Sequence, residues 1–306
     1  MLRLYTHPAC LQHNPGPYHA EQPARLRAVL QALDHDRFAA LDRIEAPQAS
    51  TEHLLRVHSA AHVDHILSIN PTSGTQNLDE DTLMSPGSRD AALHAAGAMT
   101  AAVDAVLKDQ AQRAFCAIRP PGHHATPDQA MGFCLFNNIA VGAAHALAVH
   151  GLTRVAIADF DVHHGNGTQA IFEREPRVLF VSSHQSPLYP ESGQQDECGV
   201  GNIVNGTLPP GAGSDAFRAL WGDILLPRIH AFKPQLILIS AGFDAHRDDP
   251  LAQLQLGQED FAWLTERLVA LAQTHAQGRI VSTLEGGYNI AALAACAADH
   301  VQALMD

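Results

Sequence analysis

Apolar positions along this chain fall into two alternating patterns. Short, nearly continuous apolar runs are typical of strands buried on both faces. They occur at residues 3–6, 114–118, 155–160, 178–182, 236–240 and 280–284. Between them, apolar residues recur at helical spacing in residues 23–33, 88–107, 138–149, 215–231, 259–276 and 290–304. Strands that alternate with helices predict an α/β fold, in which a central parallel sheet carries helices on both faces.

No linker, repeat or low-complexity stretch divides the chain. Its 306 residues are 46% hydrophobic, enough for a large core, and α/β folds of this length often form one domain. We therefore expect a single domain over residues 1–306. The most irregular stretch, residues 70–86, is short enough to be a loop at the mouth of a site.

Polar clusters follow four of the predicted strands. They occupy residues 119–124, 159–167, 241–244 and 285–288. The carboxyl ends of the strands in an open parallel sheet border one crevice, and ligands bind there. We therefore expect the four clusters to share a site.

The cluster at residues 159–167 has the composition of a metal site. Asp161 and His163 alternate with apolar residues, so on extended backbone their side chains point to the same side. Asp244 offers a third ligand. A carboxylate combined with a neutral imidazole suits Zn²⁺ or Fe²⁺ better than Ca²⁺ or Mg²⁺. A lone Asp or His at a strand end is usually a cap or a turn residue, but the combination predicts a metal centre.

Five motifs together resemble those of one family. They are Arg-Pro-Pro-Gly-His-His at 119–124, Gly-Phe-Cys-Leu-Phe-Asn-Asn at 132–138, and the segments 159–167, 240–244 and 285–288. In this order they resemble the zinc-dependent histone deacetylases of the arginase/deacetylase superfamily, over nearly the whole chain. Asn166 and Glu285 are similar to the residues of class II and many bacterial members. The resemblance implies the single-domain arginase/deacetylase fold.

The resemblance also implies roles for individual residues. Three side chains would bind zinc: Asp161, His163 and Asp244. The catalytic groups would be an acid/base pair with its orienting partners and a carbonyl-polarising hydroxyl: His123 with Asp159, His124 with Asn166, and Tyr288. A structural K⁺ would be held by Asp159, Asp161, His163, Ser182 and Ser183, and a second K⁺ would lie around Phe172 and Val178. Arg25, at a helix start, would brace the loops of the site.

The chemistry of such a site follows from charge and pKa. Three protein ligands leave a position on Zn²⁺ for water, and the metal both lowers the pKa of that water and polarises an amide carbonyl. We expect His124 to take the proton of the attacking water, and His124 or His123 to protonate the leaving amine. Tyr288 would donate a hydrogen bond to the oxyanion. The flexible backbone of the double glycine before it would allow the Tyr288 hydroxyl to swing inward.

The resemblance implies a narrow substrate tunnel. Phe133 and Tyr189 would flank the aliphatic stem of an acyl-lysine, although aromatics beside Gly or Pro are often simply packed. The other substrate-binding residues would be Gly132, Leu251 and Gly287. Polyamine-specific relatives place a glutamate after the Asp-Pro that follows the third zinc ligand, whereas this chain has Leu251 there. This favours acyl-lysine substrates, although the acidic residues at 79–81 could attract a cationic amine.

Three other functions stay in view. One is the same chemistry on a small acylated amine such as a polyamine. Another is an inactive acyl-lysine binding module, but such a module has no use for an acid/base pair and an oxyanion donor. Arginase-like two-metal chemistry would need further carboxylates at the metal.

Composition limits partners and location. The net charge of −13 disfavours binding to nucleic acid and fits cationic or neutral substrates. Five cysteines without a C-x-x-C spacing suggest neither a disulfide framework nor a cysteine metal site. No segment reads as a signal peptide or a membrane span, so we expect a cytoplasmic location and no membrane partner. A homo-oligomer stays open.

Overall fold

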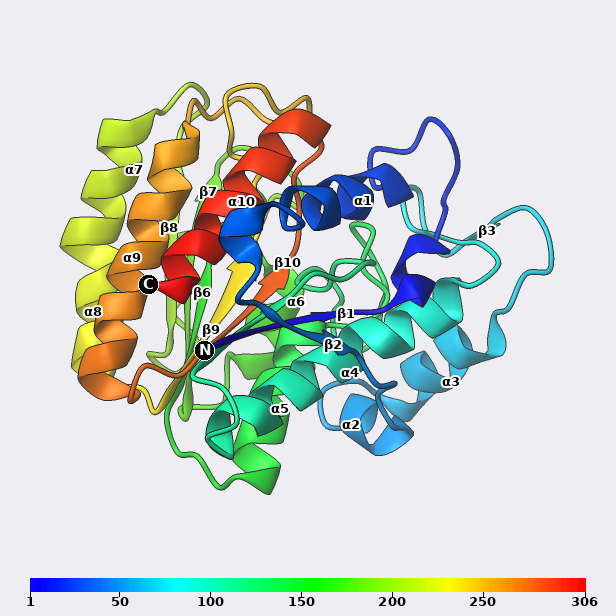
Figure 1. Ribbon diagram of the computed structural model, residues 1–306, viewed down its shortest axis with the longest axis horizontal. Helices are drawn as coiled ribbons and strands as arrows, with labels where there is room; N and C mark the ends of the chain where they lie inside the picture. The colour runs from blue at the N-terminus through cyan, green and yellow to red at the C-terminus, as the bar shows by residue number, and fades with distance from the viewer.

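An eight-stranded parallel sheet forms the centre of the computed structural model, which describes residues 1–306 (Figure 1). Its strand order is β2-β1-β5-β10-β9-β6-β7-β8. The strands are β1 (Leu2–Thr6), β2 (Asp42–Glu45), β5 (Arg113–Cys116), β6 (Val155–Asp159), β7 (Val178–Gln185), β8 (Ile203–Leu208), β9 (Leu236–Ala241) and β10 (Ile280–Leu284).

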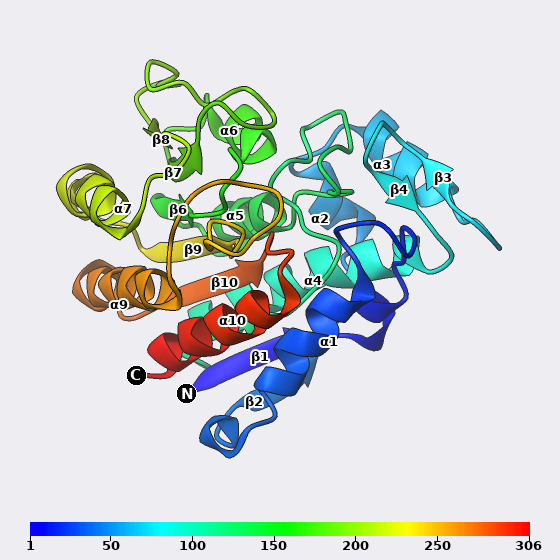
Figure 2. The same cartoon turned by 90° about the horizontal axis from the view of Figure 1, so that it is seen from above.

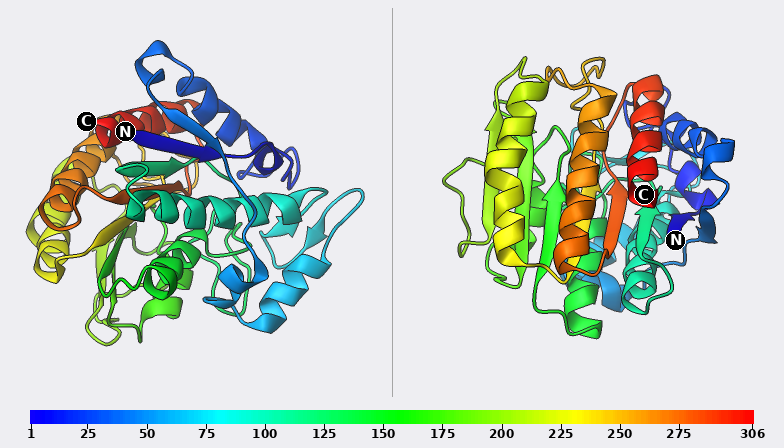
Figure 3. Two further views of the ribbon diagram at one scale, coloured as in Figure 1. Left: turned by 60° about the horizontal axis from the view of Figure 1, so that its bottom comes forward. Right: turned by 60° about the vertical axis from the view of Figure 1, so that its left-hand side comes forward.

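Helices cover both faces of this sheet (Figure 2). One layer contains α4 (Ser88–Leu107), α5 (Asn138–Val149) and the short α6 (Asn166–Phe172). The other contains α1 (Pro23–Ala32), α7 (Ser214–Leu220), α8 (Leu226–Phe232), α9 (Gln258–His275) and α10 (Ile290–Met305). In this second layer, α7 and α8 follow each other along one line beside α9 and α10 (Figure 3, right). The predicted α/β architecture is confirmed.

Burial explains which strands the sequence predicted. All residues of β5, β6, β9 and β10 are buried, and such strands give continuous apolar runs. The two strands that were not predicted, β2 and β8, lie at the two edges of the sheet. Their residues are partly exposed and partly polar, so neither segment stands out as an apolar run.

Smaller elements also differ from the prediction. Two short helices, α2 (Thr51–Leu55) and α3 (Ala60–Ser68), were not predicted, nor was α6, which begins in the last two residues of the polar cluster 159–167. The segment 215–231 is helical as expected, but a π turn at Trp221–Leu225 joins α7 to α8. The irregular residues 70–86 contain a small antiparallel hairpin of β3 (Gln76–Asn77) and β4 (Leu83–Met84).

The sheet order places the site. Strands β5, β10, β9 and β6 are consecutive neighbours at its centre, and all pair in parallel. The four polar clusters predicted from the sequence follow these four strands. They therefore lie together at the carboxyl ends of the central strands. None of the helices combines the length and the apolar character that a membrane-spanning segment needs.

Candidate active site

A cavity of about 240 Å³ opens at the carboxyl ends of the central strands. It brings together residues from six loops that are far apart in the sequence. The lining residues are Asp81, His124, Gly132, Phe133, His163, Leu188, Tyr189, Leu251 and Tyr288. An apolar wall with a few converging polar groups is the usual composition of a small-molecule site.

The three predicted zinc ligands lie together beside this cavity. His163 Nδ1 is 3.1 Å from Asp161 Oδ1 and 3.2 Å from Asp244 Oδ2. All three residues are buried. Asp161 Oδ2 accepts a hydrogen bond from the Gly286 backbone (2.8 Å), and Asp244 Oδ1 accepts one from the Val162 backbone (2.9 Å). These contacts fix the orientation of both carboxylates.

One atom of this group lacks a hydrogen bond. Asp244 Oδ2 is buried and accepts none in spite of the nearby imidazole. Burying a charged oxygen without a partner is costly. Two glycines keep the space around the carboxylates clear, because a Cβ at Gly242 would overlap Asp161 and a Cβ at Gly286 would overlap both carboxylates. The arrangement therefore leaves room and charge for a cation.

The charges of the group also fit a divalent cation. Burial alone would lower the pKa of His163, but the nearby carboxylates of Asp161 and Asp244 raise that pKa to about 10. Burial would raise the pKa of Asp161, but the neighbouring imidazoles of His123 and His163 hold it well below its usual value. Two carboxylates thus compete for a positive partner, and two carboxylate oxygens with one imidazole nitrogen form a set that Zn²⁺ accepts.

The tandem histidines are held by different partners. His123 Nδ1 lies 2.9 Å from Asp159 Oδ2, whereas His124 Nδ1 lies 2.8 Å from Asn166 Oδ1. Because an amide oxygen only accepts, His124 Nδ1 carries the proton and its Nε2 is the basic atom when the ring is neutral. The amide orientation of Asn166 is supported by its nitrogen, which faces Met131 Sδ at 3.3 Å.

These partners separate the two histidines electrostatically. Burial would lower the pKa of His123, but the carboxylates of Asp159 and Asp161 raise it well above its usual value. Burial is the larger of two causes that lower the pKa of His124 well below its usual value, and the adjacent His123 is the second. The pair therefore combines an imidazole that favours its charged form with one that favours its neutral form, as acid and base require.

Glu285 has a larger part in the site than the sequence suggested. Its buried carboxylate accepts hydrogen bonds from the backbone of Gly122 (2.7 Å) and His123 (3.2 Å) and from Ser240 Oγ (3.2 Å). Burial raises its pKa to about 7. This side chain links its own loop to the tandem-histidine loop and to the end of β9. A lone acid that directly follows a buried strand was the available signal.

Tyr288 is held from two sides. Its backbone nitrogen donates to Asp249 Oδ2 (2.7 Å), and the guanidinium carbon of Arg25 lies 4.7 Å from the centre of its ring. Arg25 also donates to the carbonyl oxygens of Gly287 and Glu285, both at 2.6 Å. These contacts agree with the bracing role expected for Arg25.

The predicted tunnel residues mostly meet at the cavity. The Phe133 ring lies 5.8 Å from that of Tyr288, and the Tyr189 ring lies 5.2 Å from that of His124. Gly132 has φ +55°, and a Cβ there would overlap the His124 ring, so glycine is required. Gly287 does not line the cavity, while Leu188 and Asp81 do. Leu188 was not predicted, because nothing in its local sequence distinguishes it.

The residues of the expected structural K⁺ site also lie together. Asp159 ends β6 next to Ser182 of β7 in the register of the sheet, and all the residues are buried. The carbonyl oxygens of Asp161 and His163 accept no hydrogen bond from the chain. Unpaired buried carbonyl oxygens are the ligands that proteins offer to K⁺.

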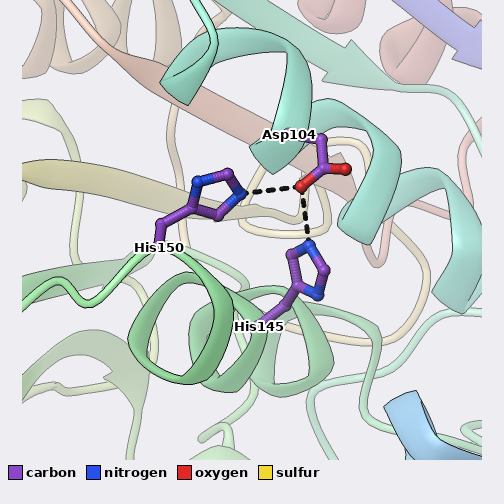
Figure 4. Close-up of side chains that lie close together, drawn as sticks. All are labelled: Asp104, His145 and His150. Carbon is purple, nitrogen blue, oxygen red and sulfur yellow. Dashed lines mark hydrogen bonds and ion pairs between the residues drawn. The ribbon is translucent and has the colours of Figure 1, made fainter.

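A second group of carboxylate and imidazoles lies between α4 and α5 (Figure 4). Both His145 Nε2 and His150 Nε2 are 2.7 Å from Asp104 Oδ1. The other carboxylate oxygen of Asp104 accepts from Lys108 Nζ (2.9 Å), and Arg56 Nη1 lies 2.9 Å from His145 Nδ1. The sequence predicted no ligand role for these residues.

Comparison with known proteins gives a consistent result. A family model described as histone deacetylase domain matches residues 19–304. The chain is 42% identical to a histone deacetylase-like amidohydrolase of Pseudomonas aeruginosa, over 94% of this chain and 81% of that protein. It is 41% identical to a probable deacetylase of Archaeoglobus fulgidus, over 93% of this chain and 80% of that protein. The crystal structure of the HDA15 HD domain superposes with a TM-score of 0.93 at 34% identity, covering 100% of this chain and 88% of that one. The chain therefore belongs to the histone deacetylase family.

Proposed function

We propose that this deacetylase is a zinc-dependent amidohydrolase that removes acetyl or other acyl groups from lysine side chains of peptides or proteins. One observation carries the proposal. The unpaired Asp244 Oδ2 lies beside His163, and the cavity that His163 lines also holds His124 and Tyr288. A metal, a base and an oxyanion donor would thus meet at one point, as amide hydrolysis requires.

Asp161, His163 Nδ1 and Asp244 Oδ2 would hold the metal ion. Bound there, Zn²⁺ supplies a Lewis acid and lowers the pKa of water, while Fe²⁺ fits the same donor set. Asp159, Asp161, His163, Ser182 and Ser183 would hold a structural K⁺.

The side chains of the cavity would perform the proton transfers. His124 accepts the proton of the attacking water at Nε2, and its bond to Asn166 keeps that nitrogen free. His123, paired with Asp159, supplies positive charge beside the developing oxyanion, and one of the two rings then protonates the leaving amine. The Tyr288 hydroxyl donates to the oxyanion, a contribution of roughly 2.7 to 4 kcal/mol by analogy with other such donors.

The walls of the cavity favour a linear methylene chain. Phe133, Tyr189, Leu188 and Leu251 provide apolar surface, and aromatic faces pack well against an aliphatic stem. Leu251 offers no charge for a second ammonium group, which supports acyl-lysine over acetylated polyamine. Asp81 is the specific reason to keep the second candidate, because it is the one acidic residue of segment 79–81 that lines the cavity.

A turnover comparison tests the proposal. Purified protein is assayed with acetyl-lysine peptides and with acetylated polyamines, and the metal content of the same sample is measured. We expect zinc-dependent hydrolysis with the peptides preferred. Preference for polyamines would select the second candidate. Zinc-loaded protein that binds acetyl-lysine peptides without cleaving any amide would indicate a binding module instead.

A further inference from the structure

Three backbone carbonyl oxygens converge on one side-chain nitrogen between α6 and β7. The nitrogen is Asn202 Nδ2, and it lies 2.7 Å from Phe172 O, 2.8 Å from Val178 O and 3.1 Å from Glu175 O. Asn202 is 5% exposed and directly precedes the edge strand β8. We call these three oxygens the carbonyl cradle.

The occupant of the cradle behaves as a small positive group. An amide nitrogen carries two hydrogens and accepts nothing, so three oxygens share two donated hydrogens. The other end of the side chain fixes this orientation, because Asn202 Oδ1 accepts from the Val200 backbone at 3.2 Å. Converging carbonyl dipoles are also how proteins replace the hydration shell of K⁺.

The second K⁺ implied by the family resemblance was expected around Phe172 and Val178, two residues of this cradle. We propose that in this chain the Asn202 amide replaces that ion, so the cradle binds no monovalent cation. The surrounding charge agrees, because the Glu175 carboxylate is turned to Arg177, whose Nε and Nη2 lie 2.8 and 2.5 Å from it. No carboxylate then remains in the cradle to attract a cation.

The cradle has a structural purpose in the site. α6 begins at Asn166, which orients His124, and ends at Phe172, whose carbonyl oxygen belongs to the cradle. β7 begins at Val178 and carries Ser182. Asn202 therefore ties both segments to the edge of the sheet, and this link does not depend on the salt in solution.

Thallium, which replaces K⁺ and scatters X-rays anomalously, tests the proposal in crystals. In wild-type crystals soaked in Tl⁺, we expect no anomalous peak among the three carbonyl oxygens. Asn202→Ala should open the cradle and produce a peak there, whereas Asn202→Leu, which keeps the volume but removes the donor, should not. A Tl⁺ peak in the wild-type cradle, with the amide turned aside, would overturn the proposal, as would an empty cradle in Asn202→Ala.

Thermal unfolding gives a second test in solution. The midpoint of each protein is compared in KCl and in tetramethylammonium chloride at equal concentration. In the tetramethylammonium salt, both variants should unfold at a lower temperature than wild type. Replacing the tetramethylammonium salt by KCl should raise the unfolding midpoint of Asn202→Ala by more than it raises the midpoint of wild type or of Asn202→Leu. Equal K⁺ increments in all three proteins would contradict the proposal. Neither readout depends on zinc or on turnover, so a failure of the proposed function would leave this test intact.

Discussion

The molecule contains two groups in which carboxylate and imidazole meet, and they differ in what remains unsatisfied. In the group of Asp104, His145 and His150, both carboxylate oxygens accept hydrogen bonds and each imidazole has a partner. In the group of Asp161, His163 and Asp244, one buried oxygen has no hydrogen bond. Residue types and distances are similar in the two groups. The unmet negative charge is what distinguishes the proposed metal site.

Nearby cations explain the difference. Arg56 donates to His145 Nδ1, which places the proton of that ring on Nε2, facing Asp104. Lys108 occupies the other oxygen of Asp104. No lysine or arginine pairs with the carboxylates of Asp161 or Asp244. The protein thus supplies its own cations in one group, whereas in the other that role is left to the metal of the proposed function.

The largest expected effect comes from removing a ligand in each group. Asp244→Ala should lose zinc and reduce deacetylation to background, because two remaining ligands cannot hold the ion against solvent. Asp104→Ala, the matched control, should keep one equivalent of zinc and near-normal kcat/KM. Metal content and turnover measured on the same samples check both. Full zinc occupancy in Asp244→Ala would remove it from the ligand set.

The oxyanion donor gives the next effect. Tyr288→Phe should lower kcat by about 10²- to 10³-fold with zinc content unchanged, because its hydrogen bond strengthens only in the transition state. KM should change little. Tyr18→Phe, at a fully exposed tyrosine, is the control and should behave as wild type. An unchanged kcat in Tyr288→Phe would exclude that hydroxyl from the mechanism.

Leu251 allows a smaller test of substrate choice. Leu251→Glu should shift the kcat/KM ratio toward acetylated polyamines by about tenfold. A carboxylate about 4 Å from an ammonium contributes on the order of 4 kcal/mol at an intermediate dielectric, and desolvation and solvent screening remove much of this. Leu251→Gln, similar in size and uncharged, should show no such shift. If the wild type already prefers polyamines, Asp81 becomes the better candidate for the selecting residue.

The smallest effect concerns how the group of Asp104, His145 and His150 makes the stability of the fold depend on pH. Burial would raise the pKa of Asp104, but hydrogen bonds from Lys108, His145 and His150 hold it well below its usual value. Since the folded-state pKa is depressed, this carboxylate stabilises the fold above its unfolded pKa of about 3.9, and the contribution is lost as the pH falls below that value.

Urea unfolding of Asp104→Asn measures this contribution. The side chain of Asp104 is 34% exposed, so the variant should be less stable than wild type by only about 1 kcal/mol at pH 7. This difference in the free energy of unfolding between variant and wild type should become smaller near pH 3.5. A gap that stays constant over this range would show that the charge of Asp104 is irrelevant to the fold.

The central part of the site was predictable from local sequence. Asp161, Asp244 and Tyr288 follow fully buried strands whose apolar runs are obvious, and the parallel arrangement brings their ends together. The contacts of Asn202 and Asp104 were not predictable. They depend on how a loop meets an edge strand and how α4 packs on α5, and no local pattern of apolar residues encodes either. Edge strands such as β2 were missed for the related reason that half-exposed strands mix polar with apolar residues.

The position of the site within the sheet has a consequence for its dynamics. The loops that carry the proposed metal ligands and the tandem histidines extend from strands that have hydrogen-bonded neighbours on both sides. Asp81, in contrast, belongs to a segment whose residues 72–77 are exposed. Backbone amides in β6 and β9 should therefore exchange with solvent only on global opening, and those of residues 72–77 through local fluctuations, a contrast that hydrogen exchange measures directly. Such a division lets the entrance adjust its shape to an acylated partner while the reacting centre stays rigid.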